Sequence, residues 1–142
     1  MNNIELNKYK DIVENVIQYA RQENNNYTDG NRKKMGDIDL YEAINRRNGS
    51  KLWQYLNSLD YDTIKIVEVM MYVGRDYSII SEEGIENEEI KHLDTPLEFF
   101  TKIYDDFSDR GWESQSIVVE QIYGKAPLDK YLERAVKLLY II

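Results

Sequence analysis

A nearly continuous apolar stretch at residues 61–73 limits most strongly how this chain can fold. A helix that is apolar nearly all round lies at the centre of a fold, although the β-branched residues would also suit a buried strand. Asp60 favours the helix, because its carboxylate can accept hydrogen bonds from the free amides of the first turn, and Gly74 stands where a helix-ending residue is expected. The apolar members are Ile64, Ile66, Val67, Val69, Met70, Met71 and Val73.

Apolar residues at helical spacing predict further helices on both sides of this stretch. The clearest start signal is the capping box at residues 95–98, Thr-Pro-Leu-Glu, which has proline at the first helical position. Ser50 is a second candidate N-cap, and Gly111 and Gly124 follow two of the apolar runs as helix ends. The predicted helices cover residues 4–23, 38–47, 51–59, 61–73, 96–110, 113–123 and 127–142.

Two segments show no clear helical period. Residues 24–36 are rich in turn-forming residues and are expected to form a loop. Residues 77–94 are ambiguous, since 77–80 suit an extended chain and the remainder suits a polar connection with one helical turn. Together these patterns predict an all-α fold, a single compact bundle of six or seven helices around the apolar central helix, in one domain over residues 1–142.

The composition excludes several kinds of site and targeting signal. The chain has 142 residues, a length typical of one domain, and no cysteine. Disulfides, thiolate catalysis and sulfur-ligated metals are therefore excluded. No segment approaches about 18 consecutive apolar residues, and the N-terminal residues lack the apolar stretch of a signal peptide. We expect a cytoplasmic protein without a membrane partner.

The charge is strongly acidic and lies in one half of the sequence. The net charge is −8, and residues 76–142 carry 7 basic and 15 acidic groups, whereas residues 1–75 carry 11 of each. Nucleic acid is not an expected partner, because phosphate binding needs clustered lysine and arginine. The plainest interpretation is a solvated acidic face, and the same field would steer a basic protein partner.

Few residues support catalysis. The single histidine, His92, stands in a polar segment, whereas histidine ligands and bases usually come with partners. The sequence has no G-x-S-x-G elbow, no phosphate-binding loop and no G-x-G-x-x-G turn. A Ser or Cys triad would lack one of its members. We therefore expect no catalytic residue, no cofactor and no metal site.

Carboxylates are the one exception to this pattern. Two groups of acidic residues, in segments 83–89 and 105–109, have helical spacing. They would hold Mg²⁺ if both segments were helical and faced each other, as in all-helical nucleotide pyrophosphohydrolases. Such spacing also arises by chance in a segment with 12 acidic residues among positions 76–113. The two groups are Glu83, Glu86 and Glu89, and Asp105, Asp106 and Asp109. The same side chains, together with Glu82, form the candidate acidic partner surface.

A short polar motif directly follows the most apolar stretch. Arg75, Asp76 and Tyr77 come immediately after Gly74. The arginine could bind a ligand, but a guanidinium fork also suits a structural contact with a carboxylate. The structural interpretation is the stronger of the two, and the motif stays a candidate site for a ligand or partner.

Three sequence blocks resemble a family of bacterial domains of unknown function. They are Ala-Arg-Gln-Glu at 20–23, Val-Gly-Arg-Asp-Tyr at 73–77, and the run from Gly124 to Arg134. The resemblance implies a compact helical domain and no particular activity. If Arg21 and Arg75 meet, they would form a polar cluster with Glu23 and Asp76.

The sequence thus supports three functions in competition. The first is a non-enzymatic protein-interaction module, whose sharpest form is an immunity-type or inhibitor protein for a basic partner. The chain has 12 tyrosines available as interface anchors. The second is a metal-dependent nucleotide hydrolase that uses carboxylates of residues 82–109. The third is a binder of a small anionic ligand around Arg21 and Arg75. The oligomeric state is left open.

Overall fold

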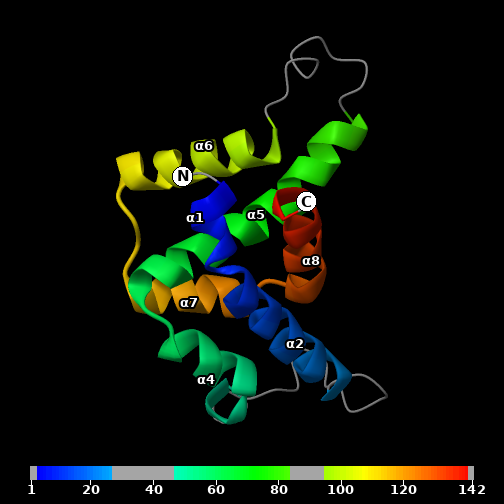
Figure 1. Cartoon of the computed structure of the whole chain (residues 1–142). Helices are drawn as coiled ribbons and strands as arrows, with labels where there is room; N and C mark the ends of the chain where they lie inside the picture. The colour runs from blue at the N-terminus through cyan, green and yellow to red at the C-terminus, as the bar shows by residue number, and fades with distance from the viewer. Residues whose placement is uncertain (1–2, 27–46, 84–94, 141–142) are drawn as a thin grey trace.

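The structure, a computed structural model, describes residues 3–26, 47–83 and 95–140 (Figure 1). These residues form helices, and no strand occurs among them, which confirms the all-α prediction. The helices are α1 (Asn3–Asn7), α2 (Lys10–Asn26), α4 (Lys51–Ser58), α5 (Tyr61–Glu83), α6 (Pro96–Arg110), α7 (Gln115–Tyr123) and α8 (Leu128–Leu139).

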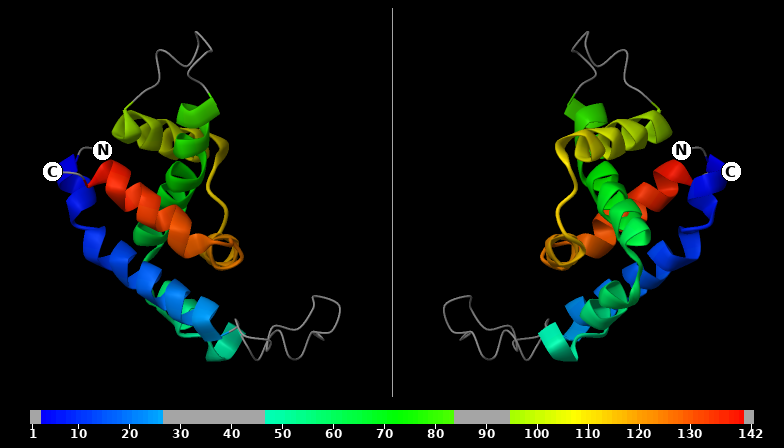
Figure 2. Two further views of the ribbon diagram at one scale, coloured as in Figure 1. Left: turned by 90° about the vertical axis from the view of Figure 1, so that its right-hand side faces the viewer. Right: turned by 90° about the vertical axis from the view of Figure 1, so that its left-hand side faces the viewer.

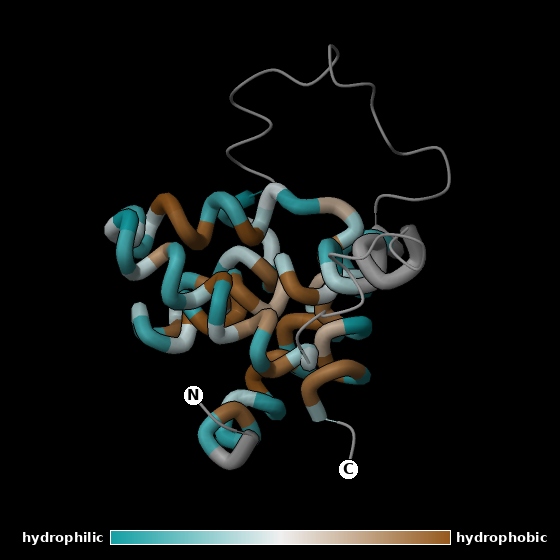
Figure 3. Tube along the Cα trace, turned by 90° about the horizontal axis from the view of Figure 1, so that it is seen from above, coloured by the Kyte–Doolittle hydropathy of each residue, from teal (hydrophilic) through white to brown (hydrophobic). Residues whose placement is uncertain are grey.

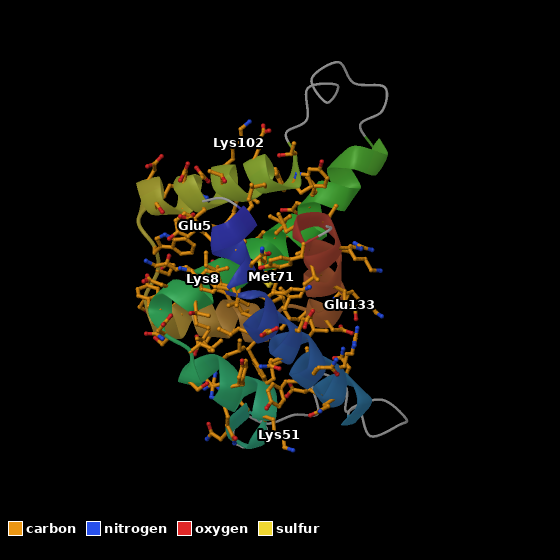
Figure 4. All side chains as sticks on the ribbon, in the orientation of Figure 1. Glu5, Lys8, Lys51, Met71, Lys102 and Glu133 are labelled. Carbon is orange, nitrogen blue, oxygen red and sulfur yellow. The ribbon has the colours of Figure 1, made fainter. Side chains whose placement is uncertain are left out.

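Helix α5 is the centre of the bundle, as its apolar sequence predicts. It packs against α6, α7 and α8, and its side chains Ile64, Val67 and Met70 have no exposed surface. The helix begins where expected, because the Asp60 carboxylate accepts a hydrogen bond from the amide of Thr63 at 2.8 Å. Figure 4 shows Met71 of the same helix in the interior between the other elements.

The predicted end of this helix at Gly74 is wrong. Helix α5 continues through Gly74 to Glu83, so residues 77–80 are helical and not extended. Gly74 is buried where α8 crosses, and a Cβ atom added there would lie 1.7 Å from the carbonyl oxygen of Tyr131. The glycine therefore serves close helix packing and does not end the helix. Residues 84–94, the rest of the ambiguous segment, lie outside the described residues.

The other predicted helix boundaries depend on local caps, and most are confirmed. The Ser50 hydroxyl accepts from the Trp53 amide at 3.1 Å, and the Thr95 hydroxyl accepts from the Glu98 amide at 3.2 Å. Gly111 follows α6 with a φ of +87°, a conformation that favours glycine. These contacts lie within one turn of the residues they cap, which explains why the sequence alone reveals them.

The first predicted helix differs from the structure. Residues 4–23 were expected to form one helix, but a turn at Lys8 and Tyr9 separates α1 from α2. Helix α2 then runs to Asn26, three residues into the predicted loop 24–36. The remainder of that loop and nearly all of the predicted helix 38–47 lie outside the described residues.

The remaining helices cover α5 from several sides. Helix α8 packs against both α5 and α2, and α4 packs against α2 and α7. Figures 1 and 2 show α6 at one end of the bundle and α4 at the opposite end. In Figure 3, hydrophobic and hydrophilic stretches alternate along the helices, as expected of helices that have one face in the core. None of the helices in the described part of the chain is long and apolar enough to cross a bilayer.

Candidate functional site

The outer face of α6 carries the described half of the predicted acidic surface. Asp105, Asp106 and Asp109 are all exposed, and Asp106 accepts a hydrogen bond from Arg110 one turn later. The opposite face of α6 packs on the core through residues such as Phe100 and Phe107, so helical periodicity directs the carboxylates outward. Figure 4 shows side chains of this face, including Lys102, extending away from the bundle.

The other half of the predicted acidic surface is largely outside the described chain. Glu82 and Glu83 belong to the last turn of α5, whereas Glu86, Glu89 and His92 fall in the segment 84–94. Within the described ranges, no three Asp, Glu or His side chains lie close enough together to hold a metal ion.

Arg21 joins two helices of the bundle. Its Nε donates to Glu133 Oε1 at 2.8 Å, and its Nη2 contacts the same oxygen, so α2 is linked to α8. The guanidinium lowers the pKa of Glu133 below the ordinary value, mainly through this hydrogen bond. The pair borders a shallow hollow of about 350 Å³ between the two helices. The side chains that line it are Glu14, Ile17, Gln18, Arg21, Glu133, Val136 and Lys137.

Arg75 makes its contacts within its own helix. Its guanidinium donates to both carboxylate oxygens of Asp76, at 2.7 and 3.1 Å, and stacks over the ring of Tyr72 at 4.7 Å. The hydrogen bond to Asp76 raises the pKa of Arg75 further, so the guanidinium stays charged. Tyr77, two residues on, packs its ring against Phe99 of α6 at 5.6 Å.

The four residues of the predicted polar cluster therefore make three separate contacts. Arg21 pairs with Glu133, Arg75 pairs with Asp76, and Glu23 accepts a hydrogen bond from the Tyr123 hydroxyl at 2.8 Å. The sequence predicted that these residues make polar contacts, but it did not indicate the distant partners of Arg21 and Glu23. Both Glu133 and Tyr123 lie at least 100 positions away in the chain from the residues that they bond.

Sequence reasoning missed Glu68, which interrupts the apolar stretch of the central helix. Its side chain is only 2% exposed, and one carboxylate oxygen has no hydrogen-bond partner. Burial raises the pKa of Glu68 to about 7, while nearby Lys125 lowers it and Glu113 raises it. Glu68 is the one charged residue between Ile66 and Val73, and this isolated position was the signal that could have identified it.

Comparison with known proteins adds no relative. No family model, no curated protein and no solved structure matches this chain.

Proposed function

We propose that this chain is a non-catalytic binding protein that associates with a basic protein, in the manner of immunity-type or inhibitor proteins. The observation that carries the proposal is the outer face of α6, where Asp105, Asp106 and Asp109 are exposed side by side. The binding face is thus a rigid helix surface whose inner side is anchored in the core.

The position of these carboxylates within α6 supports a role outside folding. Asp109 lies in the last turn, where the negative end of the helix dipole disfavours acidic side chains, and Asp105 and Asp106 lie one turn earlier. For Asp109 this placement costs about 0.3–1 kcal/mol. Arg110, in the same turn, offsets part of this cost as a cation near the helix end, and it contacts Asp106. Residues that lower the stability of the free protein are expected to serve association instead.

The charge of the whole chain points to the same kind of partner. The net charge of −8 produces a negative potential around the molecule. Such a field speeds encounter with a positively charged protein and repels acidic ones. Screening by salt weakens this attraction between exposed charges. A complex formed through α6 is therefore expected to weaken as ionic strength rises.

A variant that removes two of the three acidic charges from this face of α6 tests the proposal. In Asp105→Asn/Asp109→Asn, the contact between Asp106 and Arg110 is kept, while two charges are removed. The tagged wild-type protein is used to capture partners from a lysate of its source organism, and the captured protein is purified. Its affinity for both forms is then measured by calorimetry at low and high salt. We expect the variant to bind at least about tenfold more weakly, which corresponds to about 1.4 kcal/mol.

The matched control removes the same charge from another helix. Asp11→Asn/Glu14→Gln changes two exposed carboxylates of α2 and leaves α6 intact. This control is expected to retain most of the affinity. Equal weakening in both variants would mean that net charge alone attracts the partner. Unchanged binding in the α6 variant, or an acidic captured protein, would refute the proposal.

A further inference from the structure

Glu68 combines deep burial with an incomplete set of hydrogen bonds. It lies near the middle of α5, is 2% exposed, and leaves one carboxylate oxygen without a partner. An ionised carboxylate in such a place is costly unless a cation or hydrogen-bond donor reaches it. The side chain therefore either stays protonated or needs a partner that the present arrangement does not supply.

Charged groups approach Glu68 from the connections at both ends of α7. Glu113 stands between α6 and α7, and Lys125 stands in the corner between α7 and α8. The two act in opposite directions, because the lysine favours the ionised form and the glutamate disfavours it. Helix α7 itself packs on the core through the apolar residues Val118, Val119 and Ile122.

The other groups around this part of α5 are aromatic rings and the cations that cover them. On α5 itself, Lys65 lies over Tyr61 and Trp112, and Arg75 lies over Tyr72. Helix α6 contributes Phe107, which packs on Tyr72 at 5.7 Å, and α8 contributes Tyr131 beside Gly74 and near Arg75. Lys65 lies over two rings, and Arg75 is also paired with Asp76. Among the described residues, Lys125 is the cation whose charge lowers the pKa of Glu68.

Lys125 lies close to Glu68 but is held elsewhere. Its ammonium lies over the ring of Tyr72, 5.5 Å from the centroid, and Tyr72 is one turn from Glu68 on the same face of α5. A lysine stem has four rotatable carbon links, so its ammonium can shift by several ångströms without a large backbone movement. The cation–π contact at a partly exposed ring is weak, at about 0.5–1 kcal/mol.

We propose that Glu68 and Lys125 form a proton-controlled switch. While Glu68 is protonated, the Lys125 ammonium rests over Tyr72, as in the present structure. When Glu68 releases its proton to solvent, the ammonium moves to the unpartnered oxygen and draws the corner at residues 124–127 toward α5. The gain is a charge-assisted hydrogen bond to a buried carboxylate, which exceeds the lost contact with the ring.

The switch operates near neutral pH. Burial raises the pKa of Glu68 to about 7, so both states are populated under ordinary conditions. The corner that moves connects α7 to α8, and α8 packs on both α5 and α2. Proton release by Glu68 in the central helix thereby changes the position of the corner between α7 and α8.

Ring-current shifts provide a direct measurement of where Lys125 lies. The intact protein is labelled with ¹³C at the lysine ε carbons, and Lys125→Met assigns the signal. At about pH 5, we expect the chemical shift of the Lys125 ε protons to lie upfield because of the ring current of Tyr72. By about pH 9, we expect it to reach the value of a lysine that contacts no ring. The amide signals of Gly124 and Ala126 are expected to change with the same midpoint.

Two variants identify the titrating group. Glu68→Gln is expected to hold Lys125 over the ring at every pH, and Glu113→Gln is expected to lower the midpoint, because a like charge is removed. A Lys125 signal that does not change with pH would overturn the proposal. So would a transition that survives in Glu68→Gln, or a midpoint that does not fall in Glu113→Gln.

Discussion

At the scale of single residues, burial sets the chemistry of Glu68 more strongly than its charged neighbours do. Desolvation is the largest influence on its pKa, followed by Lys125 and then Glu113. Arg21 and Arg75 are different, because both remain partly exposed and already have carboxylate partners. Exposed pairs of this kind contribute about 0–1 kcal/mol, so they position side chains more than they stabilise the fold.

The raised pKa of Glu68 predicts how stability depends on pH. The pKa of Glu68 in the folded protein, about 7, exceeds the ordinary value of 4.5. Its contribution to the free energy of unfolding is therefore complete below pH 4.5 and is lost as the pH rises through about 7. Because one pKa unit corresponds to about 1.4 kcal/mol, the free energy of unfolding falls by on the order of 3 kcal/mol over this range. Urea unfolding of wild type and Glu68→Gln at several pH values measures it.

We expect Glu68→Gln to be more stable than wild type above about pH 7, with the advantage shrinking toward pH 4.5. Glu98→Gln, a change at an exposed carboxylate of α6, serves as the control and is expected to keep the wild-type pH profile. A constant difference between Glu68→Gln and wild type at every pH would contradict the assignment.

At the scale of elements, the crossing of α5 and α8 organises the bundle. The backbone of Tyr131 lies against Gly74, and the amide nitrogen of Ala135 is 3.2 Å from the place that a Cβ of residue 74 would occupy. Glycine in a helix interior costs about 1 kcal/mol relative to alanine. The close approach of the two helices offsets that cost, which is why α5 continues through this residue.

Gly74→Ala is expected to destabilise the protein by about 3 kcal/mol or more, although alanine favours helix formation. The added methyl group would meet the Tyr131 carbonyl at 1.7 Å, so the two helices must separate. Denaturant unfolding measures the change. Gly49→Ala is the matched control, because no atom lies within 4 Å of its Cβ position, and its stability is expected to stay near that of wild type. Similar stability of both variants would argue against a tight crossing.

At the scale of the whole molecule, the two ends of the described chain are joined by a buried hydrogen bond. The Tyr140 hydroxyl, after the end of α8, donates to the carbonyl of Leu6 in α1 at 2.7 Å. Burial raises the pKa of Tyr140, so its hydroxyl remains a donor at neutral pH. Figure 2 shows the start of α1 beside the end of α8. This hydrogen bond joins α1 to the end of α8, although the two residues are 134 positions apart in the chain.

Tyr140→Phe is expected to lower the free energy of unfolding by about 1 kcal/mol, the usual net value of one hydrogen bond. The loss stays modest because the Leu6 carbonyl also accepts from the Tyr9 amide at 3.0 Å. Thermal unfolding measures it, with Tyr104→Phe, whose ring packs on Trp112, as the control. A Tyr140→Phe variant as stable as wild type would show that the contact does not hold the two ends together.

The sequence by itself determined the all-α class, the central apolar helix and the caps at Ser50, Asp60 and Thr95, because periodicity and capping act within a few residues of the chain. Only the tertiary structure decided that α5 passes through Gly74, that Arg21 pairs with Glu133, and that Glu68 is buried. These depend on which distant backbones and side chains pack together. Local propensity carries no information about such neighbours, and tertiary packing readily overrides it.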